Sequence, residues 1–159
     1  MTPNAGGGAP DPGEGVERRD ALSAFIYVSE ALVAFDVDDL RRLERKAQMT
    51  NFALGVTGYL FYGGGRFLQY LEGETMAVEE AVARIRYDGR HRILTYLRSP
   101  IVNRHFPNWH MKWLVENDLA ALDRPATEEI EALKNCDESH PLEFAACRRM
   151  VDALSRRLT

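Results

Sequence analysis

The sequence predicts an α+β fold in which two helices cover one face of an antiparallel or mixed β-sheet. Short aromatic and β-branched runs bounded by glycine indicate the strands, and amphipathic stretches between them indicate the helices. The chain has 159 residues, of which 45% are hydrophobic and 28% are charged. This composition is ordinary for a globular protein and fits one domain with appendages.

The first predicted strand and helix follow a leader rich in glycine, proline and acidic residues. Residues 1–20 cannot bury enough apolar surface to offset the cost of ordering, so we expect a flexible leader. Ser23–Ser29 is short, aromatic and β-branched, as is typical of a strand. Asp36 offers a helix N-cap, and the apolar residues after it recur at helical spacing, which predicts a helix ending near Asn51.

A β-hairpin and a second helix come next. Thr57–Tyr62 and Arg66–Glu72 have strand composition and are joined by Gly63–Gly65. Glycine adopts positive φ angles without a Cβ clash, which suits a tight turn at this place. An amphipathic helix then follows Gly73 and is expected to end before Gly89.

Two further strands complete the predicted sheet, at Ile93–Leu97 and Trp109–Val115. The resulting order, β-α-β-β-α-β-β, indicates a ferredoxin-like sheet with two helices on one face. Beyond the sheet, additional C-terminal helices are expected at Thr127–Asn135 and Leu142–Leu158.

These elements divide the chain into a core domain of residues 21–115 and a C-terminal helical segment of residues 116–159. The segment is expected to cap the open face of the sheet or to serve as an interaction surface for a dimer or another partner. Its last helix has an apolar stripe formed by Phe144, Cys147, Val151, Leu154 and Leu158.

Composition also narrows the class of partner and the compartment. The net charge of −4 argues against nucleic acid as a partner, because phosphate binding favours a basic surface. The N-terminus resembles no secretory signal, and no run approaches the roughly 20 apolar residues that span a bilayer, so we expect a cytoplasmic protein without a membrane partner. The only cysteines, Cys136 and Cys147, fit a reduced compartment. Cys136 and His140 have helical spacing, but Pro141 interrupts that helix and no fourth ligand is evident, so no metal site is expected.

Polar residues stand at positions whose neighbours are apolar. Asn51 lies on the side of its helix that carries Leu40, where it would either cap the helix or face a ligand; the pattern alone favours the cap. Gln69 lies on a strand with two apolar faces, so its amide needs a backbone partner or a polar ligand. Tyr27 lies on the first strand, where a tyrosine is usually core. A ligand with an amide-like edge would satisfy all these groups if they converged.

These residues belong to short motifs that, taken together, resemble the BLUF family of blue-light sensors. The resemblance covers Ser23–Val115, and several motifs in one order are far more specific than any single one. The run Ala47–Thr50 departs from the family, which often has a basic pair there and a histidine or basic residue before the asparagine. The motifs are Ile26–Ser29 (IYVS), Asn51 with Gly55–Gly58 (GVTG), Phe67–Gly73 (FLQYLEG), Arg84–His91 (RIRYDGRH) and Arg104–Met111 (RHFPNWHM).

The resemblance implies a noncovalently bound FAD, or alternatively FMN or riboflavin, between the two helices of the core. Tyr27 and Gln69 would be the photoactive pair, and Asn51 would bind the imide edge of the flavin ring. The flavin-binding residues implied in this way are Tyr27, Asn51, Gln69, Asp88, Arg90 and His91.

The resemblance also implies a mechanism. Under blue light, Tyr27 would pass an electron and a proton toward the flavin, and Gln69 would rearrange by rotation or tautomerisation, shifting the flavin absorption to the red. Trp109 and Met111 lie on the strand that would carry the signal outward, although their alternation is also typical of ordinary core. Which of the two lies beside Gln69 stays open.

We therefore expect a photoreceptor that is not an enzyme and that signals through a homo-oligomer or a separate protein effector. The main alternative is a light-insensitive ferredoxin-like binding module. An acylphosphatase-type enzyme would share this architecture, but it needs an arginine-bearing anion loop after the first strand, and Ser29–Val33 contains no cation.

Overall fold

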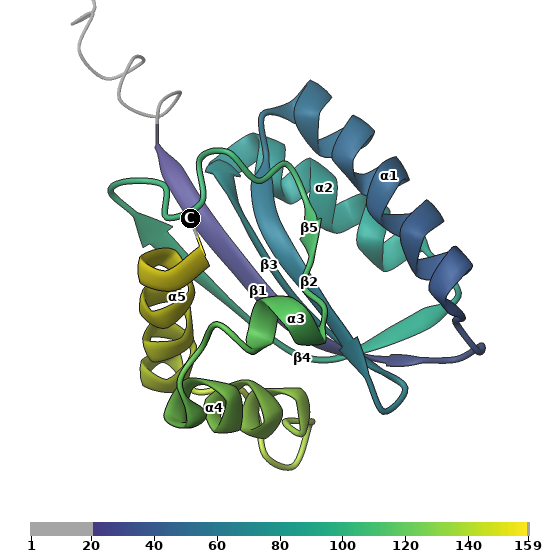
Figure 1. The fold of residues 1–159 in the computed structure, drawn as a ribbon. Coiled ribbons are helices and arrows are strands. Elements are labelled where there is room, and N and C mark those ends of the chain that lie inside the picture. The colour runs from purple at the N-terminus through teal and green to yellow at the C-terminus, as the bar shows by residue number, and fades with distance from the viewer. Residues whose placement is uncertain (1–20, 159) are drawn as a thin grey trace, which may run out of the picture.

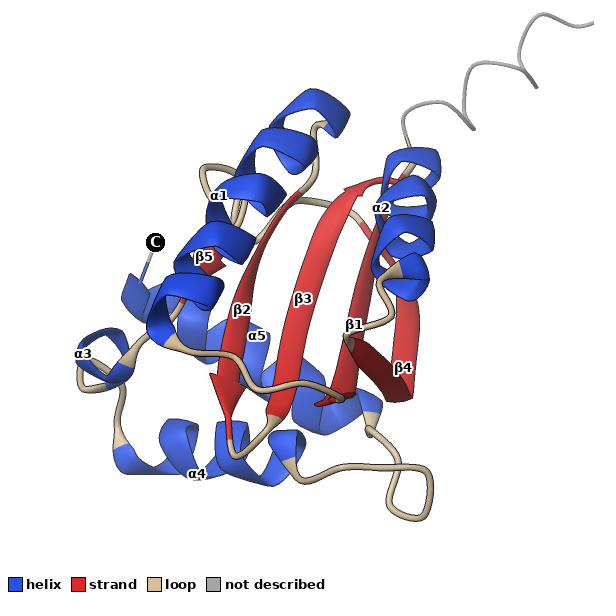
Figure 2. Ribbon diagram, turned by 90° about the vertical axis from the view of Figure 1, so that its right-hand side faces the viewer, coloured by secondary structure: helices blue, strands red, loops and turns tan. Residues whose placement is uncertain are grey.

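The computed structural model describes residues 21–158, so the predicted leader at residues 1–20 lies outside the described residues. Five strands form one sheet in the order β4-β1-β3-β2-β5. Figures 1 and 2 show helices α1 and α2 on one face of this sheet and helices α4 and α5 on the other. The strands are β1 (Leu22–Ala31), β2 (Thr57–Gly63), β3 (Arg66–Glu74), β4 (His91–Ile101) and β5 (Lys112–Trp113). The helices are α1 (Val37–Leu54), α2 (Thr75–Tyr87), α3 (Glu116–Leu119), α4 (Arg124–Lys134) and α5 (Phe144–Leu158).

The sheet is mixed, which confirms the predicted α+β fold. Strand β1 pairs antiparallel with β3 and β4, and β2 pairs antiparallel with β3 but parallel with β5. The β1–β3 register places Tyr27 directly opposite Gln69. A Cβ at Gly58 of β2 would lie 1.9 Å from the carbonyl oxygen of Tyr70, so only glycine permits this close strand approach.

Helix α1 begins as predicted but ends later. Asp36 and Asp39 form a capping box, with N···O distances of 3.0 and 2.8 Å. The C-cap is Gly55, whose φ of 70° is a left-handed conformation that glycine adopts without strain. The prediction that Asn51 caps this helix is therefore wrong. Because the helix continues to Gly55, Asn51 stays inside it with a buried side chain.

The fifth strand is much shorter than the predicted Trp109–Val115. Only Lys112 and Trp113 pair as a strand. Before them, Pro107 and Asn108 form a turn, in which the Trp109 N–H donates to the Phe106 carbonyl at 3.3 Å. This turn breaks the two-residue alternation on which the prediction of a long strand rested.

Each face of the sheet has its own hydrophobic core. The core beneath α1 and α2 contains buried side chains that include Phe25, Tyr27, Leu60, Leu71, Val82 and Met111. The core beneath α4 and α5 contains, among others, Tyr59, Phe61, Leu68, Phe106, Met150 and Leu154. Alternate strand residues thus face different cores, as the pleat of a sheet requires.

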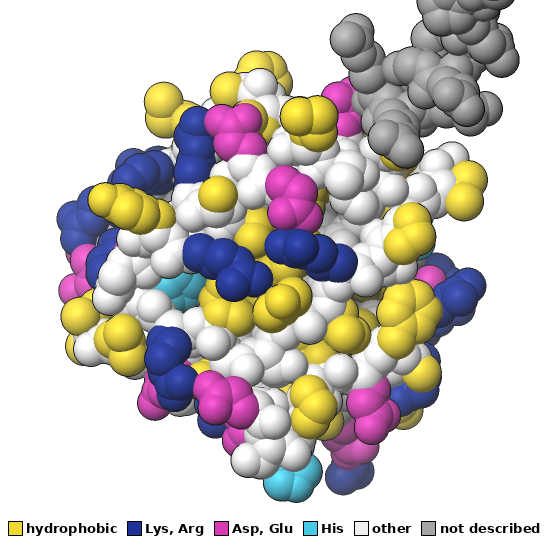
Figure 3. All heavy atoms as spheres, turned by 180° about the vertical axis from the view of Figure 1, so that it is seen from behind, with side chains coloured by type: hydrophobic (Ala, Val, Ile, Leu, Met, Phe, Trp, Pro, Cys, Tyr) yellow, Lys and Arg dark blue, Asp and Glu magenta, His cyan; other side chains and the backbone are white. Residues whose placement is uncertain are grey.

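The surface carries mixed charge. On the side of the molecule shown in Figure 3, basic and acidic side chains are interspersed with hydrophobic ones and form no broad basic surface. Within residues 21–158, no helix is both long and apolar enough to span a bilayer.

Candidate functional site

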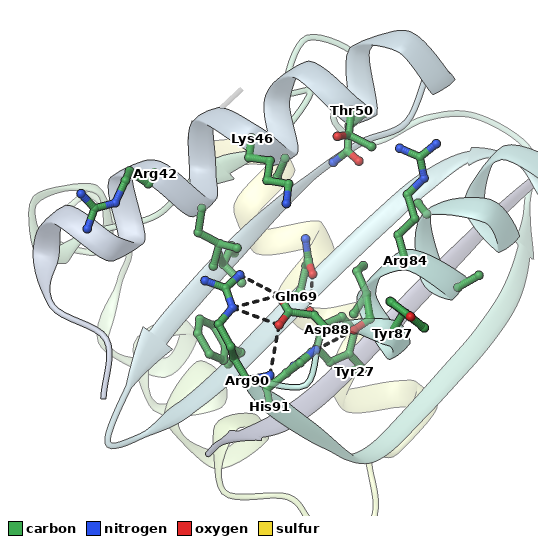
Figure 4. Close-up of a pocket in the computed structure, with 18 of the residues that line it drawn as sticks. Tyr27, Arg42, Lys46, Thr50, Gln69, Arg84, Tyr87, Asp88, Arg90 and His91 are labelled. Carbon is green, nitrogen blue, oxygen red and sulfur yellow. Dashed lines mark hydrogen bonds and ion pairs between the residues drawn. The ribbon is translucent and has the colours of Figure 1, made fainter. Parts of the chain in front are cut away.

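A cavity of about 960 Å³ lies between α1 and α2, over the strands that carry Tyr27 and Gln69. This volume is within the range of small-molecule sites, roughly 300–1,000 Å³. Figure 4 shows side chains from α1 along one wall, side chains from α2 along the other, and strand residues between them. All the residues predicted to bind a cofactor line this cavity: Tyr27, Asn51, Gln69, Asp88, Arg90 and His91.

A buried hydrogen bond joins Tyr27 and Gln69 at the base of the cavity. The Tyr27 hydroxyl donates to Gln69 Oε1, and Gln69 Nε2 faces Met111 Sδ at 3.4 Å. Burial, and then the negative charge of Asp88, raise the pKa of the Tyr27 hydroxyl far above its ordinary value. Tyr27 is therefore a neutral phenol whose proton is directed at the Gln69 carboxamide.

Asn51 presents an unsatisfied amide to the same cavity. The residue is only 5% exposed, yet its side chain makes no hydrogen bond with any described residue. The amide therefore opens onto the cavity, where a ligand can reach it. A ligand with a donor and an acceptor on one edge could pair with both amide groups, so the cavity fits a ring with an imide edge, such as flavin.

Asp88 and Arg90 form an ion pair at the rim of the cavity. Arg90 Nε lies 3.0 Å from Asp88 Oδ1, and Arg90 Nη2 lies 2.7 Å from Asp88 Oδ2. These bonds lower the pKa of the Asp88 carboxyl to about 2. The same guanidinium lies over the ring of Phe35, 5.4 Å from its centroid. Arg90 is thus fixed from two sides.

His91 lines the cavity, but its ring nitrogens are already bound by the protein. Nε2 lies 2.8 Å from the carbonyl oxygen of Ile85, which can only accept, so this nitrogen carries a proton. Nδ1 lies 2.8 Å from Ser29 Oγ. Because both nitrogens are engaged, His91 offers the cavity its ring surface rather than a free hydrogen-bonding group.

Basic side chains at the mouth of the cavity were not identified from the sequence. Lys46 lines the cavity and makes no ion pair within residues 21–158. Arg42 is paired with Asp39 at 2.8 Å, and Arg84 is paired with Glu80 at 3.2 Å. In sequence these cations resemble an ordinary solvated helix face. Only the packing of α1 opposite α2 brings them together.

Met111, and not Trp109, lies beside Gln69. Met111 is 1% exposed and belongs to the core beneath α1 and α2. Trp109 packs against the other core, stacked on Phe106 with ring centroids 5.2 Å apart. Lys112 covers the Trp109 ring, with Nζ 4.8 Å from its centroid. The early turn before β5 therefore places these residues on different faces of the sheet.

Comparison with known proteins agrees with this geometry. The family model described as "BLUF: Sensors of blue-light using FAD" matches residues 22–112, more than half of the chain. The chain belongs to the BLUF family. Membership confirms the predicted resemblance and flavin cofactor, since the family is defined by FAD-dependent sensing of blue light.

Similar proteins include a photoactivated adenylate cyclase subunit beta from Euglena longa, 35% identical over 101 residues. That match covers 62% of this chain but only 12% of the cyclase subunit. The equivalent subunit from Euglena gracilis is 34% identical, again over 12% of its length. The chain therefore corresponds to a small part of these longer proteins.

Solved BLUF structures share the fold over most of the chain. The dark-state structure of BlrB has a TM-score of 0.66 and 30% identity, covering 88% of this chain and 96% of BlrB. The BLUF domain of BlrP1 has a TM-score of 0.59 and 30% identity, covering 85% of this chain and 88% of that domain. A longer Klebsiella pneumoniae BlrP1 structure, 28% identical with a TM-score of 0.57 over 85% of this chain and 34% of that one, is described as containing FMN.

Proposed function

We propose that this chain is a blue-light photoreceptor without enzymatic activity, in which Tyr27 and Gln69 form the photoactive pair. The observation that carries this proposal is the buried hydrogen bond from the Tyr27 hydroxyl to Gln69 Oε1, at the base of a cavity that fits flavin. An ordinary core packs aliphatic side chains without polar groups. Packing alone therefore does not explain a buried hydrogen bond between a tyrosine and a carboxamide.

The two residues have complementary roles. Flavin, when bound and excited by blue light, supplies a strong acceptor for one electron. Tyr27 is the donor of that electron and, through its hydroxyl, of a proton directed at Gln69. Gln69 is the group that rearranges, because its oxygen faces Tyr27 while its nitrogen faces the weak acceptor Met111 Sδ. A buried carboxamide suits a two-state switch, since each orientation pairs different groups.

Other residues of the cavity would hold the cofactor. Asn51 has the free amide for the imide edge of the ring, and His91 supplies a fixed ring surface. Asp88 holds Arg90 at the rim, where it joins Lys46 in a basic environment suited to the phosphates of FAD.

The output of the sensor is proposed to pass through Met111 and Trp109 to a separate protein effector or to a homo-oligomer in the cytoplasm. Met111 supports this route, because it contacts Gln69 from one side and directly precedes β5, the edge strand of the sheet. The cyclase subunits show, by their names, that relatives combine light sensing with an effector activity.

Light spectroscopy tests the photoactive pair. Purified protein supplied with FAD is expected to be yellow and to show a flavin band that shifts red under blue light and relaxes in darkness. Tyr27→Phe and Gln69→Leu should keep the flavin and lose the shift, because each removes one end of the hydrogen bond. Tyr59→Phe is the matched control: Tyr59 is buried on the other face of the sheet, and its hydroxyl has no partner among the described residues.

The Tyr59→Phe control should retain a normal photocycle. A normal photocycle in Tyr27→Phe would remove that residue from the mechanism. Colourless protein that refuses added FAD would instead support the light-insensitive binding module.

A further inference from the structure

The outer edge of β5 is paired with a helix instead of a strand. On its inner side β5 pairs with β2, and the Leu114 N–H donates to the Leu60 carbonyl at 2.9 Å. On the outer side, Gln48 Nε2 of α1 donates to the Met111 carbonyl at 2.9 Å. The Trp113 N–H donates to Glu44 Oε2, also on α1, at 2.5 Å. Figure 2 shows β5 beside α1.

The spacing of the two elements explains this pairing. Residues four apart on a helix lie on one face, about 6 Å apart along the axis. Alternate residues on a strand direct their backbone groups to the same edge at intervals of about 6.6 Å. Glu44 and Gln48 therefore match Trp113 and Met111, and one face of α1 substitutes for a missing edge strand.

Met111 consequently connects two parts of the molecule. Its side chain places Sδ 3.4 Å from Gln69 Nε2, and its carbonyl oxygen accepts a hydrogen bond from Gln48 Nε2. Gln48 does not line the flavin cavity, although Asn51, less than one turn further along α1, does. Any influence of Gln48 on the cavity through this hydrogen bond must pass through Met111.

We propose that Gln48 is a positioning residue that sets the place of Met111 beside Gln69 and couples rearrangement of Gln69 to helix α1. This inference rests on the proposed function, since it assumes that Gln69 rearranges under light. Glu44 supports Gln48 by holding the next outward-facing backbone group of the same segment. Helix α1 is then an output element as well as a wall of the cavity.

Dark-recovery kinetics test this role. Gln48→Met keeps the length of the side chain but removes its donors, and Gln48 is exposed enough for the fold to tolerate the change. The bound flavin should keep its dark spectrum, while the recovery rate should change by between about twofold and tenfold, the rate equivalent of one hydrogen bond. Arg45→Ala, on an exposed part of the same helix, is the matched control and should recover at the wild-type rate.

A double-mutant cycle separates positioning from a general effect on stability. Met111→Leu conserves volume and removes the sulfur that faces Gln69. If Gln48 acts through Met111, the effect of Gln48→Met on recovery should largely disappear in the Met111→Leu background.

Full additivity, or recovery of Gln48→Met at the rate of Arg45→Ala, would overturn the inference while leaving the proposed function intact. Absence of any light-induced shift in the wild-type protein would instead overturn both.

Discussion

At the scale of single residues, the partner of a buried tyrosine decides its role more than burial does. Tyr27 and Tyr70 are both buried, and burial raises the pKa of each hydroxyl well above its ordinary value. Tyr70 donates to the Glu72 carboxylate at 3.0 Å on the face away from the cavity, whereas Tyr27 donates to Gln69 within it. The sequence shows both as strand tyrosines, so only their surroundings distinguish the photoactive candidate.

The ion pair at the rim of the cavity gives a prediction about pH. Arg90→Ala should raise the pKa of the Asp88 carboxyl from about 2 toward its ordinary value, because the hydrogen bonds from Arg90 are the largest cause of the lowering. A lowered folded-state pKa stabilises the protein above the unfolded value of about 3.9, and this contribution is lost as the pH falls toward 2.

Titration of the Asp88 carboxyl by NMR measures this shift directly. Arg92→Ala is the control, because Arg92 pairs with Glu30 and Glu138 instead. If Asp88 titrated at the same pH in Arg90→Ala as in the wild type, the assigned cause would be incorrect.

At the scale of elements, what the sequence could predict depended on whether the signal was local. Helix α1 and the β2–β3 hairpin follow from a cap, glycines and periodicity within the segments themselves. The short length of β5 was missed because the turn at Pro107 and Asn108 interrupts an apparent two-residue alternation, and the partners of its outer edge are side chains on α1, more than 60 residues earlier in the chain. For a similar reason the helical spacing alone favoured a cap at Asn51, because a C-cap and an inward-facing residue can occupy the same sequence position.

Strand β3 is joined to the segment before β5 by a buried carboxylate. Glu72 is 0% exposed and accepts the backbone N–H groups of Phe106 at 2.6 Å and His105 at 2.9 Å. The two N–H groups bind different carboxylate oxygens. The side-chain oxygens of Glu72 thus hold the chain that leads to Met111.

Replacing this carboxylate tests its contribution to stability. Glu72→Gln should lower the free energy of unfolding by about 2–3 kcal/mol, because the amide NH₂ would face one backbone N–H and leave it unsatisfied. Glu74→Gln, at the exposed end of the same strand, should change it by less than about 0.5 kcal/mol. Urea denaturation measures both variants. Equal losses would show that the Glu72 side chain is not what anchors the segment.

At the scale of the whole molecule, the two faces of the sheet differ. One face carries the flavin cavity between α1 and α2, and the other carries the core beneath α4 and α5. The family motifs predicted the base of the cavity, including Tyr27 and Gln69, and also its rim at Asp88, Arg90 and His91. They do not include Lys46, whose charged helix face looks ordinary in sequence.

The C-terminal helix α5 is proposed to be an integral part of the fold. In its predicted apolar stripe, Leu154 is 0% exposed within the second core, whereas Phe144 is 55% exposed; the side chain of Leu158 lies outside the described residues. The stripe therefore contains both a packed position and a solvent-accessible one, and replacing each of these side chains by alanine compares them.

Leu154→Ala should lower the free energy of unfolding by about 2–5 kcal/mol, because it leaves a cavity in a close-packed core. Phe144→Ala is the control, and its loss should be much smaller because that side chain is already largely in water. Urea denaturation of the FAD-loaded protein gives both values, and the bound-flavin spectrum should be unchanged, since α5 lies across the sheet from the cavity. Small and equal losses in the two variants would show that α5 is not packed as a cap, and would favour the C-terminal segment as an interaction surface.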